Sequence, residues 1–234
     1  MGIRAIITPA TDLSRKNVDD MFRLMQEYYC NVTRAQFLDD LDEKEWVILL
    51  WENGRICGFS TQMLFNHDVE GYQIQVIFSG DTVIEKNYRH SLALPVAWGC
   101  LMLSILSECP DRELYWLLTS KGYKTYRFLP VFIREFYPSC MKETPTFEKA
   151  LLRSLGRQKF GDRFDSESGI IRASEGSQYL RPGVADITQI RRRDKHIAFF
   201  KKANPGHAKG DELVCIARCH ENNLKPFILR RLHQ

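Results

Sequence analysis

The sequence predicts an α/β fold in which helices flank a mixed, mostly antiparallel sheet. Three observations lead to this prediction. Two segments near the start carry apolar residues at spacings of three and four, as amphipathic helices do. The next apolar segments have the length and composition of strands and include a hairpin turn signal. A long apolar helix and another strand follow, and this order is typical of a layered α/β domain.

The chain is expected to begin with a strand and two helices. RAIITPA, from Arg4 to Ala10, has the composition of a strand. Asp12 or Ser14 can cap the helix that follows. The apolar face of that helix comprises Val18, Met21, Phe22, Met25, Tyr28 and Tyr29. A second helix is expected from Thr33, because Thr33 and Gln36 have the spacing of a capping box.

Three strands are expected next. WVILLWENGRICGFSTQMLF contains two strands joined at the turn signal Glu52-Asn53-Gly54. QIQVIFSGDTVIE is a third, long strand with Ser79 and Gly80 in its middle. A glycine inside a strand often marks a bulge or a close backbone approach. We therefore expect the strand to be irregular at Gly80.

The middle of the chain is expected to be a helix, a strand and a second helix. The first helix runs from about Leu92 to Leu106, and Cys109-Pro110-Asp111 ends it. ELYWLLTS is the strand. TYRFLPVFIREFYP is helix-like, with Pro130 restricting or kinking it.

The C-terminal part has weaker patterns. Thr144 and Pro145 open a helix that continues through Leu155. Residues 156–186 are expected to form a long loop or insertion, HIAFF a strand, and DELVCIARC a late strand. Residues 1–140 would then form the core, and 141–234 an insertion and C-terminal extension that returns a strand to the sheet of the same structural domain.

Charge is distributed unevenly along the chain. Residues 1–150 hold 16 Lys/Arg against 20 Asp/Glu, whereas residues 151–234 hold 17 against 9. A basic C-terminal third indicates an acidic partner. Nucleic acid is disfavoured because no nucleic-acid motif is present. The most apolar window is too short for a membrane span, so we expect a soluble, cytoplasmic protein.

The seven cysteines do not form a recognisable disulfide or metal framework. Their number is odd and they are scattered through a chain of ordinary length. Cys215, Cys219 and His220 have no second ligand pair, which a zinc site would need. We therefore interpret the cysteines as structural and predict no metal.

The order of elements resembles that of the GNAT superfamily of N-acyltransferases. In that family a bulged fourth strand splays from the fifth, and the bulged strand usually ends in a pattern such as V-x-P-x-Y-R-G-x-G-x-G. Val83, Tyr88 and Arg89 match this pattern, and Glu85 stands at the proline position. The three glycine positions hold His90, Leu92 and Leu94.

The resemblance implies a GNAT-like fold and an enzyme that moves an acyl group from a thioester to an amine. The residues that would bind the donor are Ser79, Gly80, Thr82, Val83, Arg89, His90 and Ser91. A base must take the proton of the amine, and Asp81 is the first candidate and Glu85 the second. Tyr126 is the candidate acid for the leaving thiolate. The acceptor would be an amine-bearing small molecule or peptide.

The missing glycines leave the identity of the donor open. Glycines let a backbone approach a diphosphate closely. Without them, either the side chains of Arg89, His90 and Ser91 bind the diphosphate of acyl-CoA, or the acyl-phosphopantetheine is carried on an acidic acyl carrier protein. In the alternative reading, the chain is a catalytically silent binding protein that uses the cleft and its basic tail.

Overall fold

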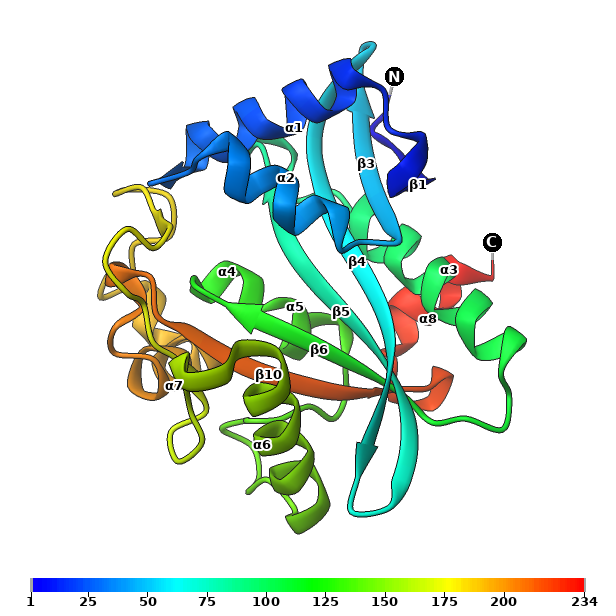
Figure 1. Ribbon diagram of the computed structural model, residues 1–234, viewed down its shortest axis with the longest axis vertical. Helices are drawn as coiled ribbons and strands as arrows, with labels where there is room; N and C mark the ends of the chain where they lie inside the picture. The colour runs from blue at the N-terminus through cyan, green and yellow to red at the C-terminus, as the bar shows by residue number, and fades with distance from the viewer. Residues whose placement is uncertain (1, 234) are drawn as a thin grey trace.

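The centre of the fold is a sheet of eight strands in residues 2–233, the part of the chain that the computed structural model describes (Figure 1). The strand order is β1-β3-β4-β5-β6-β10-β8-β7. The strands span β1 Arg4–Pro9, β3 Trp46–Glu52, β4 Arg55–Val69, β5 Tyr72–Ile84, β6 Leu114–Ser120, β7 Phe164–Asp165, β8 Ile170–Ile171 and β10 Glu212–Cys219. Within this sheet β5 and β6 pair in parallel and the other neighbours pair antiparallel. The predicted mixed, mostly antiparallel sheet is confirmed.

Helices cover both faces of the sheet. They are α1 Arg15–Tyr28, α2 Arg34–Asp42, α3 Ala93–Glu108, α4 Tyr123–Tyr126, α5 Phe128–Phe132, α6 Thr146–Phe160, α7 Lys195–Ala203 and α8 Pro226–Leu232. The core under α3, α4, α5, α7 and α8 is continuous and includes Ile77 of β5. Two smaller cores, under α1 with α2 and under α6, lie on the opposite face. The result is a helix–sheet–helix arrangement of three layers (Figure 1).

The N-terminal elements form as the local sequence predicts. Ser14 caps α1 in a capping box with Asn17, and Thr33 caps α2 by accepting a hydrogen bond from the backbone N–H of Gln36. Asn53 and Gly54, between β3 and β4, both have positive φ. Positive φ at two central residues is the geometry of a two-residue hairpin turn with the twist of its strands.

Two predictions beyond β6 are wrong. HIAFF lies in helix α7 and not in a strand, because Asp194 caps a helix there and Ile197 and Phe200 turn the same face to the core. The helix predicted through Tyr137 stops at Phe132. From there the chain runs extended, and Ile133 and Tyr137 each form an isolated bridge to a distant segment.

The segment predicted as a loop is partly ordered into regular structure. Helix α6 extends to Phe160, and β7 and β8 add two short strands at the edge of the sheet. A separate pair joins β2 (Tyr29–Cys30) to β9 (Tyr179–Leu180). This pair ties the end of α1 to the C-terminal part of the chain.

The late strand β10 lies between β6 and β8. Its residues Cys215 and Cys219 are buried in the core, and burial raises the pKa of both thiols. No helix within residues 2–233 combines the length and the apolar composition that crossing a membrane requires.

Candidate active site

The parallel pairing of β5 and β6 ends in the middle of both strands. The last paired residues are Ser79 and Leu118, although β5 continues to Ile84 and β6 to Ser120. Beyond this point β6 stays paired with β10 and β5 stays paired with β4. The two halves of the sheet therefore separate, as Figure 1 shows at the diverging ends of β5 and β6.

A bulge in β5 lies at the start of this separation. Two residues of β5, Gly80 and Asp81, stand opposite the single residue Thr61 of β4. A Cβ on residue 80 would lie 2.7 Å from Thr61 Oγ1 and 3.0 Å from Lys44 Cε. Only glycine fits such a close approach without a shift of its neighbours. The irregularity predicted at Gly80 is confirmed.

The bulge leaves backbone donors of β5 without a neighbouring strand. The N–H of Glu85 donates to Cys57 O at 2.9 Å. Residue pairs of an antiparallel ladder alternate between hydrogen-bonded and non-bonded, so Val83 also bonds back to β4. The N–H groups of Thr82 and Ile84 consequently point into the gap between β5 and β6. Such free N–H groups are suited to an oxyanion or to the amides of an extended ligand.

Three hollows meet at the gap. We call them the polar cleft, the cationic cleft and the apolar cavity. Each of the two clefts has a volume of about 500 Å³, and the cavity has about 40 Å³. Thr82 of β5 and Thr125 of α4 line all three. A molecule that fills the gap at these two threonines would thus reach each hollow.

The polar cleft contains Asp81, whose carboxyl is partly buried. Burial, together with the nearby carboxylate of Asp40, raises the pKa of Asp81 to about 7 against the opposing effect of Lys121 and Lys44. A carboxyl with this pKa is divided between its two protonation states at neutral pH. It has the property that a general base needs, namely a pKa near the working pH.

Charged partners surround Asp81 in the polar cleft. Lys44 Nζ lies 2.8 Å from Asp40 Oδ1, and Lys121 Nζ lies 2.8 Å from Glu212 Oε1. The pKa of Lys121 is raised because the attraction of Glu212, with smaller contributions from Tyr29 and Asp81, exceeds the opposing effect of burial. Lys121 therefore stays protonated at every physiological pH, and its charge acts on Asp81.

Tyr29 lines both the polar and the cationic cleft. Burial raises the pKa of its phenol to about 12, so the hydroxyl keeps its proton at neutral pH. The β2–β9 pair fixes its backbone opposite Leu180. No sequence signal marks Tyr29 as a site residue, because the strand that holds it comes from 150 positions further along the chain.

The cationic cleft lies on the other side of the gap. Its basic side chains are Lys86, Arg89, Lys124, Arg127 and Arg191, and no carboxylate from residues 2–233 lines it. Burial, together with the charges of Arg89, Arg191 and Lys86, lowers the pKa of Lys124 to about 8. Repulsion among these cations would be relieved by a bound anion.

Arg89 is held in place by the end of β5 and by α1. Its Nε donates to Ile84 O at 2.9 Å, and its guanidinium lies 5.0 Å from the centre of the Tyr28 ring. Ser91 Oγ accepts from the N–H of Ala93, the first residue of α3. The start of α3 thus has a side-chain partner from Ser91, which lies between two of the glycine positions of the pattern, those held here by His90 and Leu92.

The sequence-predicted donor residues are only partly brought together. Thr82, Val83, Arg89 and Ser91 line the cationic cleft, and Gly80 lines the polar cleft. Ser79 is buried, where its hydroxyl donates to Gln62 and accepts from the indole of Trp116. His90 is exposed and lines none of the three hollows.

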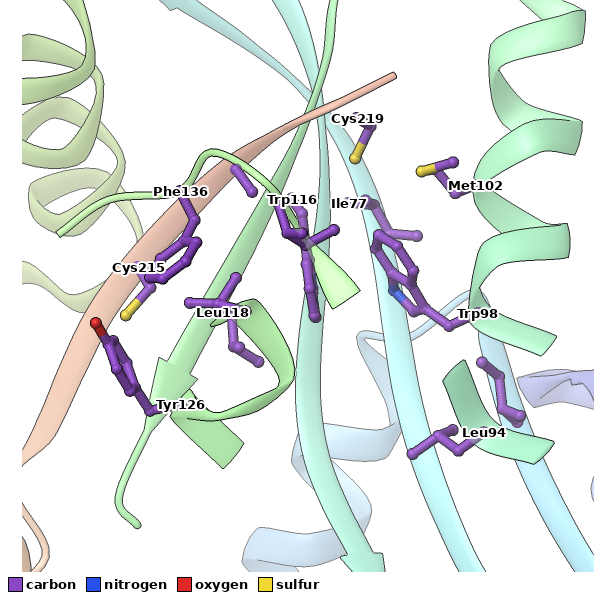
Figure 2. Close-up of a cluster of buried hydrophobic side chains, with 14 of the residues drawn as sticks. Ile77, Leu94, Trp98, Met102, Trp116, Leu118, Tyr126, Phe136, Cys215 and Cys219 are labelled. Carbon is purple, nitrogen blue, oxygen red and sulfur yellow. The ribbon is translucent and has the colours of Figure 1, made fainter. Parts of the chain in front are cut away.

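Two predicted catalytic residues lie away from the gap. Glu85 forms a two-bond ion pair with Arg55, of which one bond is 2.8 Å long. Tyr126 is fully buried, and its hydroxyl donates to Pro138 O at 3.1 Å. Figure 2 shows its ring in the hydrophobic core beside Phe136 and Cys215. Neither residue lines a cleft, so we leave both out of the proposed mechanism.

The sequence matches no protein-family model and no curated protein, whereas solved structures of N-acyltransferases resemble part of the fold. A probable N-acyltransferase from Enterococcus faecalis V583 is 15% identical with a TM-score of 0.43, covering 58% of this chain and 33% of its own. A GCN5-related N-acetyltransferase from Kribbella flavida is 12% identical with a TM-score of 0.41, covering 55% of this chain and 32% of its own. An acyl-CoA N-acyltransferase from Pseudomonas aeruginosa is 16% identical with a TM-score of 0.38, covering 56% of this chain and 88% of its own.

The chain thus spans about a third of the length of the first two of these proteins. At these scores the likeness carries no weight for activity. The predicted GNAT-like architecture is confirmed by the chain's own topology, which is a mostly antiparallel sheet whose bulged β5 separates from its parallel neighbour β6.

Proposed function

We propose that the protein is an N-acyltransferase that moves an acyl group from a thioester donor to an amine. The observation that carries this proposal is the position of Asp81. It lies on the bulge where β5 leaves β6, with a pKa raised to about 7, in the polar cleft and next to Thr82, which lines both clefts. Neither a base nor a gap alone would suggest acyl transfer, but transfer needs both at one point.

The donor would lie in the cationic cleft, with its pantetheine arm along β5. The free N–H groups of Thr82 and Ile84 offer hydrogen bonds to the amides of such an arm. The thioester carbonyl would then stand at Thr82, where the hollows meet. The N–H of Thr82 would stabilise the oxyanion of the tetrahedral intermediate.

The acceptor would enter through the polar cleft. Its amine attacks the thioester carbon while the carboxylate of Asp81 takes the amine proton. The intermediate collapses by breaking the carbon–sulfur bond, and the thiolate leaves with a hydrogen bond from the Tyr29 hydroxyl. Tyr29 replaces Tyr126 in this role because Tyr29 lines both clefts and Tyr126 lines neither.

The carrier of the acyl group would be recognised by charged side chains. Five cations and no carboxylate line the donor side, which suits the diphosphate of acyl-CoA or the acidic surface of an acyl carrier protein. Arg89 and Ser91 remain in this proposal, whereas the exposed His90 has no part in it. The cationic cleft takes over the role that glycines perform at the helix start in the resembling family.

Donor binding tests the proposal before any acceptor is known. Thermal shift of the purified protein is measured with acetyl-CoA, with a long-chain acyl-CoA, and with an acylated carrier protein. We expect a rise in Tm with at least one of them, because a ligand that binds the folded state stabilises it. Competition by adenosine 3′,5′-bisphosphate would identify coenzyme A as the carrier. Stabilisation by the acylated carrier protein alone would identify an acyl carrier protein as the carrier of the acyl group.

Release of free thiol in the presence of a panel of amines then tests turnover. We expect amine-dependent release that Asp81→Asn abolishes while donor binding stays within about twofold. Donor binding without release for any amine would favour the silent binding protein. Absence of stabilisation by every donor would refute the acyltransferase itself.

A further inference from the structure

The apolar cavity lies beneath the gap, between the sheet and helices α3, α5 and α8. The rings of Trp98 and Trp116 form one wall, with 4.2 Å between their centroids. Leu118 of β6 and Leu94 of α3 contribute further apolar surface, as Figure 2 shows. Its volume of about 40 Å³ exceeds the space that one water molecule needs.

The cavity offers little to a polar ligand because its polar lining groups are already bonded to one another. Ser79 Oγ donates to Gln62 Oε1 at 2.7 Å and accepts from Trp116 Nε1 at 2.9 Å. Ser60 Oγ and Thr82 Oγ1 are hydrogen-bonded at 2.7 Å. Among the fully buried polar atoms that line it in residues 2–233, the indole N–H of Trp98 is left without a partner, and the hydroxyl of Thr125 lies where the cavity meets both clefts. Such a site favours hydrocarbon, with room for a single oxygen acceptor beside Trp98.

The cavity opens toward the place proposed for the thioester. Pro95, Phe128 and Phe132 line both the cavity and the cationic cleft, in addition to Thr82 and Thr125. A chain attached to a carbonyl at Thr82 would therefore pass directly from the donor cleft into the cavity.

Helix α8 closes the far end of the cavity. Leu232 lies against the backbone of Gly99, where a Cβ on residue 99 would be 2.8 Å from Leu232 Cδ2. Ile228, one turn earlier on α8, is buried and also lines the cavity. The side chains of α8 thus limit the length of any chain that enters.

We propose that the cavity binds the apolar tail of the acyl group and that Leu232 sets the length of that tail. This inference rests on the proposed acyl transfer and adds its substrate class, a short straight-chain acyl group longer than acetyl. Each methylene buried there should tighten binding by about fourfold, from a transfer free energy of about 0.8 kcal/mol per CH₂. The gain should stop when the tail reaches Leu232.

A chain-length series of acyl-pantetheine thioesters tests this proposal, because pantetheine is common to both possible carriers. Binding of acetyl, butanoyl, hexanoyl and octanoyl thioesters is followed by the tryptophan fluorescence of the wild-type protein, to which Trp98 and Trp116 in the cavity wall contribute. We expect affinity to rise severalfold from acetyl to an optimum within the series and then to fall. Leu232→Ala should move the optimum to a longer chain.

Leu229→Ala is the matched control, because Leu229 is on the same helix and packs against the core without lining the cavity. It should leave the optimum unchanged. If Leu232→Ala is too unstable to study, Ile228→Val removes one methyl group from the same wall and should move the optimum in the same direction.

Equal affinity for all chain lengths, or an optimum at acetyl that neither variant moves, would overturn the cavity proposal and leave acyl transfer intact. Failure of every thioester to bind would overturn both.

Discussion

Gly80 and Thr61 approach each other so closely that a Cβ on residue 80 would lie 2.7 Å from Thr61 Oγ1. This contact explains why the bulge that separates β5 from β6 contains a glycine. It also places Asp81, the next residue, at the opening of the gap.

The contact predicts that Gly80→Ala lowers the free energy of unfolding by about 1–3 kcal/mol, as overpacking of a buried site does. Thr61→Ala should partly rescue it, because it removes the clashing hydroxyl, a buried group that has no hydrogen-bond partner in the described residues. Urea denaturation of the single and double variants measures this coupling. Additive effects of the two substitutions would show that the contact is not the cause.

The raised pKa of Asp81 predicts the pH dependence of turnover. The carboxylate is the active form of a base, and its pKa in the folded protein is about 7. The rate kcat/KM should therefore increase as the pH rises to about 7 and level off above it. The profile is measured with an acceptor amine whose own pKa lies well outside this range. A flat profile through neutral pH would exclude Asp81 as the base.

Removal of the Lys121 cation should shift the pH dependence of kcat/KM to higher pH. The cation of Lys121 lowers the pKa of Asp81, and Glu212, which raises it, would lose its neutralising partner. Lys121→Met should thus shift the rising part of the profile to higher pH. It should also cost about 1–3 kcal/mol of stability, because a partly buried carboxylate is left unpaired.

Lys159→Met is the control for this shift. Lys159 lines the same cleft but is not among the charges that shift the pKa of Asp81 most. Its substitution should leave the rising part of the profile in place. Equal displacement by both variants would point to a general effect of charge in the cleft and not to Lys121.

The cationic cleft predicts a specific role for one arginine of the basic run. Arg191 lines the cleft, whereas Arg193, two residues later in the same short helix, is exposed and does not. Arg191→Gln should weaken donor binding by about tenfold at low salt, and Arg193→Gln by less than twofold. Titration at two ionic strengths measures both. Equal effects would mean that net charge alone attracts the donor.

Local patterns predicted most of the elements up to β6. Ser14 and Thr33 cap their helices, and Asn53 and Gly54 form the hairpin turn, because each of these signals acts within a few residues. The bulge at Gly80 was predictable for the same reason. The strand prediction for HIAFF failed because four consecutive apolar residues fit a buried strand or a helix face equally well, and the Asp194 cap decides between them.

The candidate site was predictable only in part. Asp81 was predicted from its place eight residues before Arg89, close to where the family that the chain resembles has a carboxylate base, and it lines the polar cleft. Tyr29 and Lys121 were missed because their positions depend on the pairing of β2 with β9 and of Lys121 with Glu212, contacts between segments far apart in the chain. Tyr126 was chosen by position alone, because it lies where a helix was expected to begin, and the structure buries it in the core while the neighbouring Thr125 lines the clefts.

The central claim is that Asp81 takes a proton from an amine at the gap between β5 and β6. A single-turnover reaction tests it most directly, in which the acylated amine is quantified by mass spectrometry for the wild-type protein and for Asp81→Asn at saturating donor. The proposal predicts formation of the acyl-amine by the wild type and a loss of at least about a hundredfold in the variant, with donor affinity unchanged. Equal rates for the two proteins would contradict it.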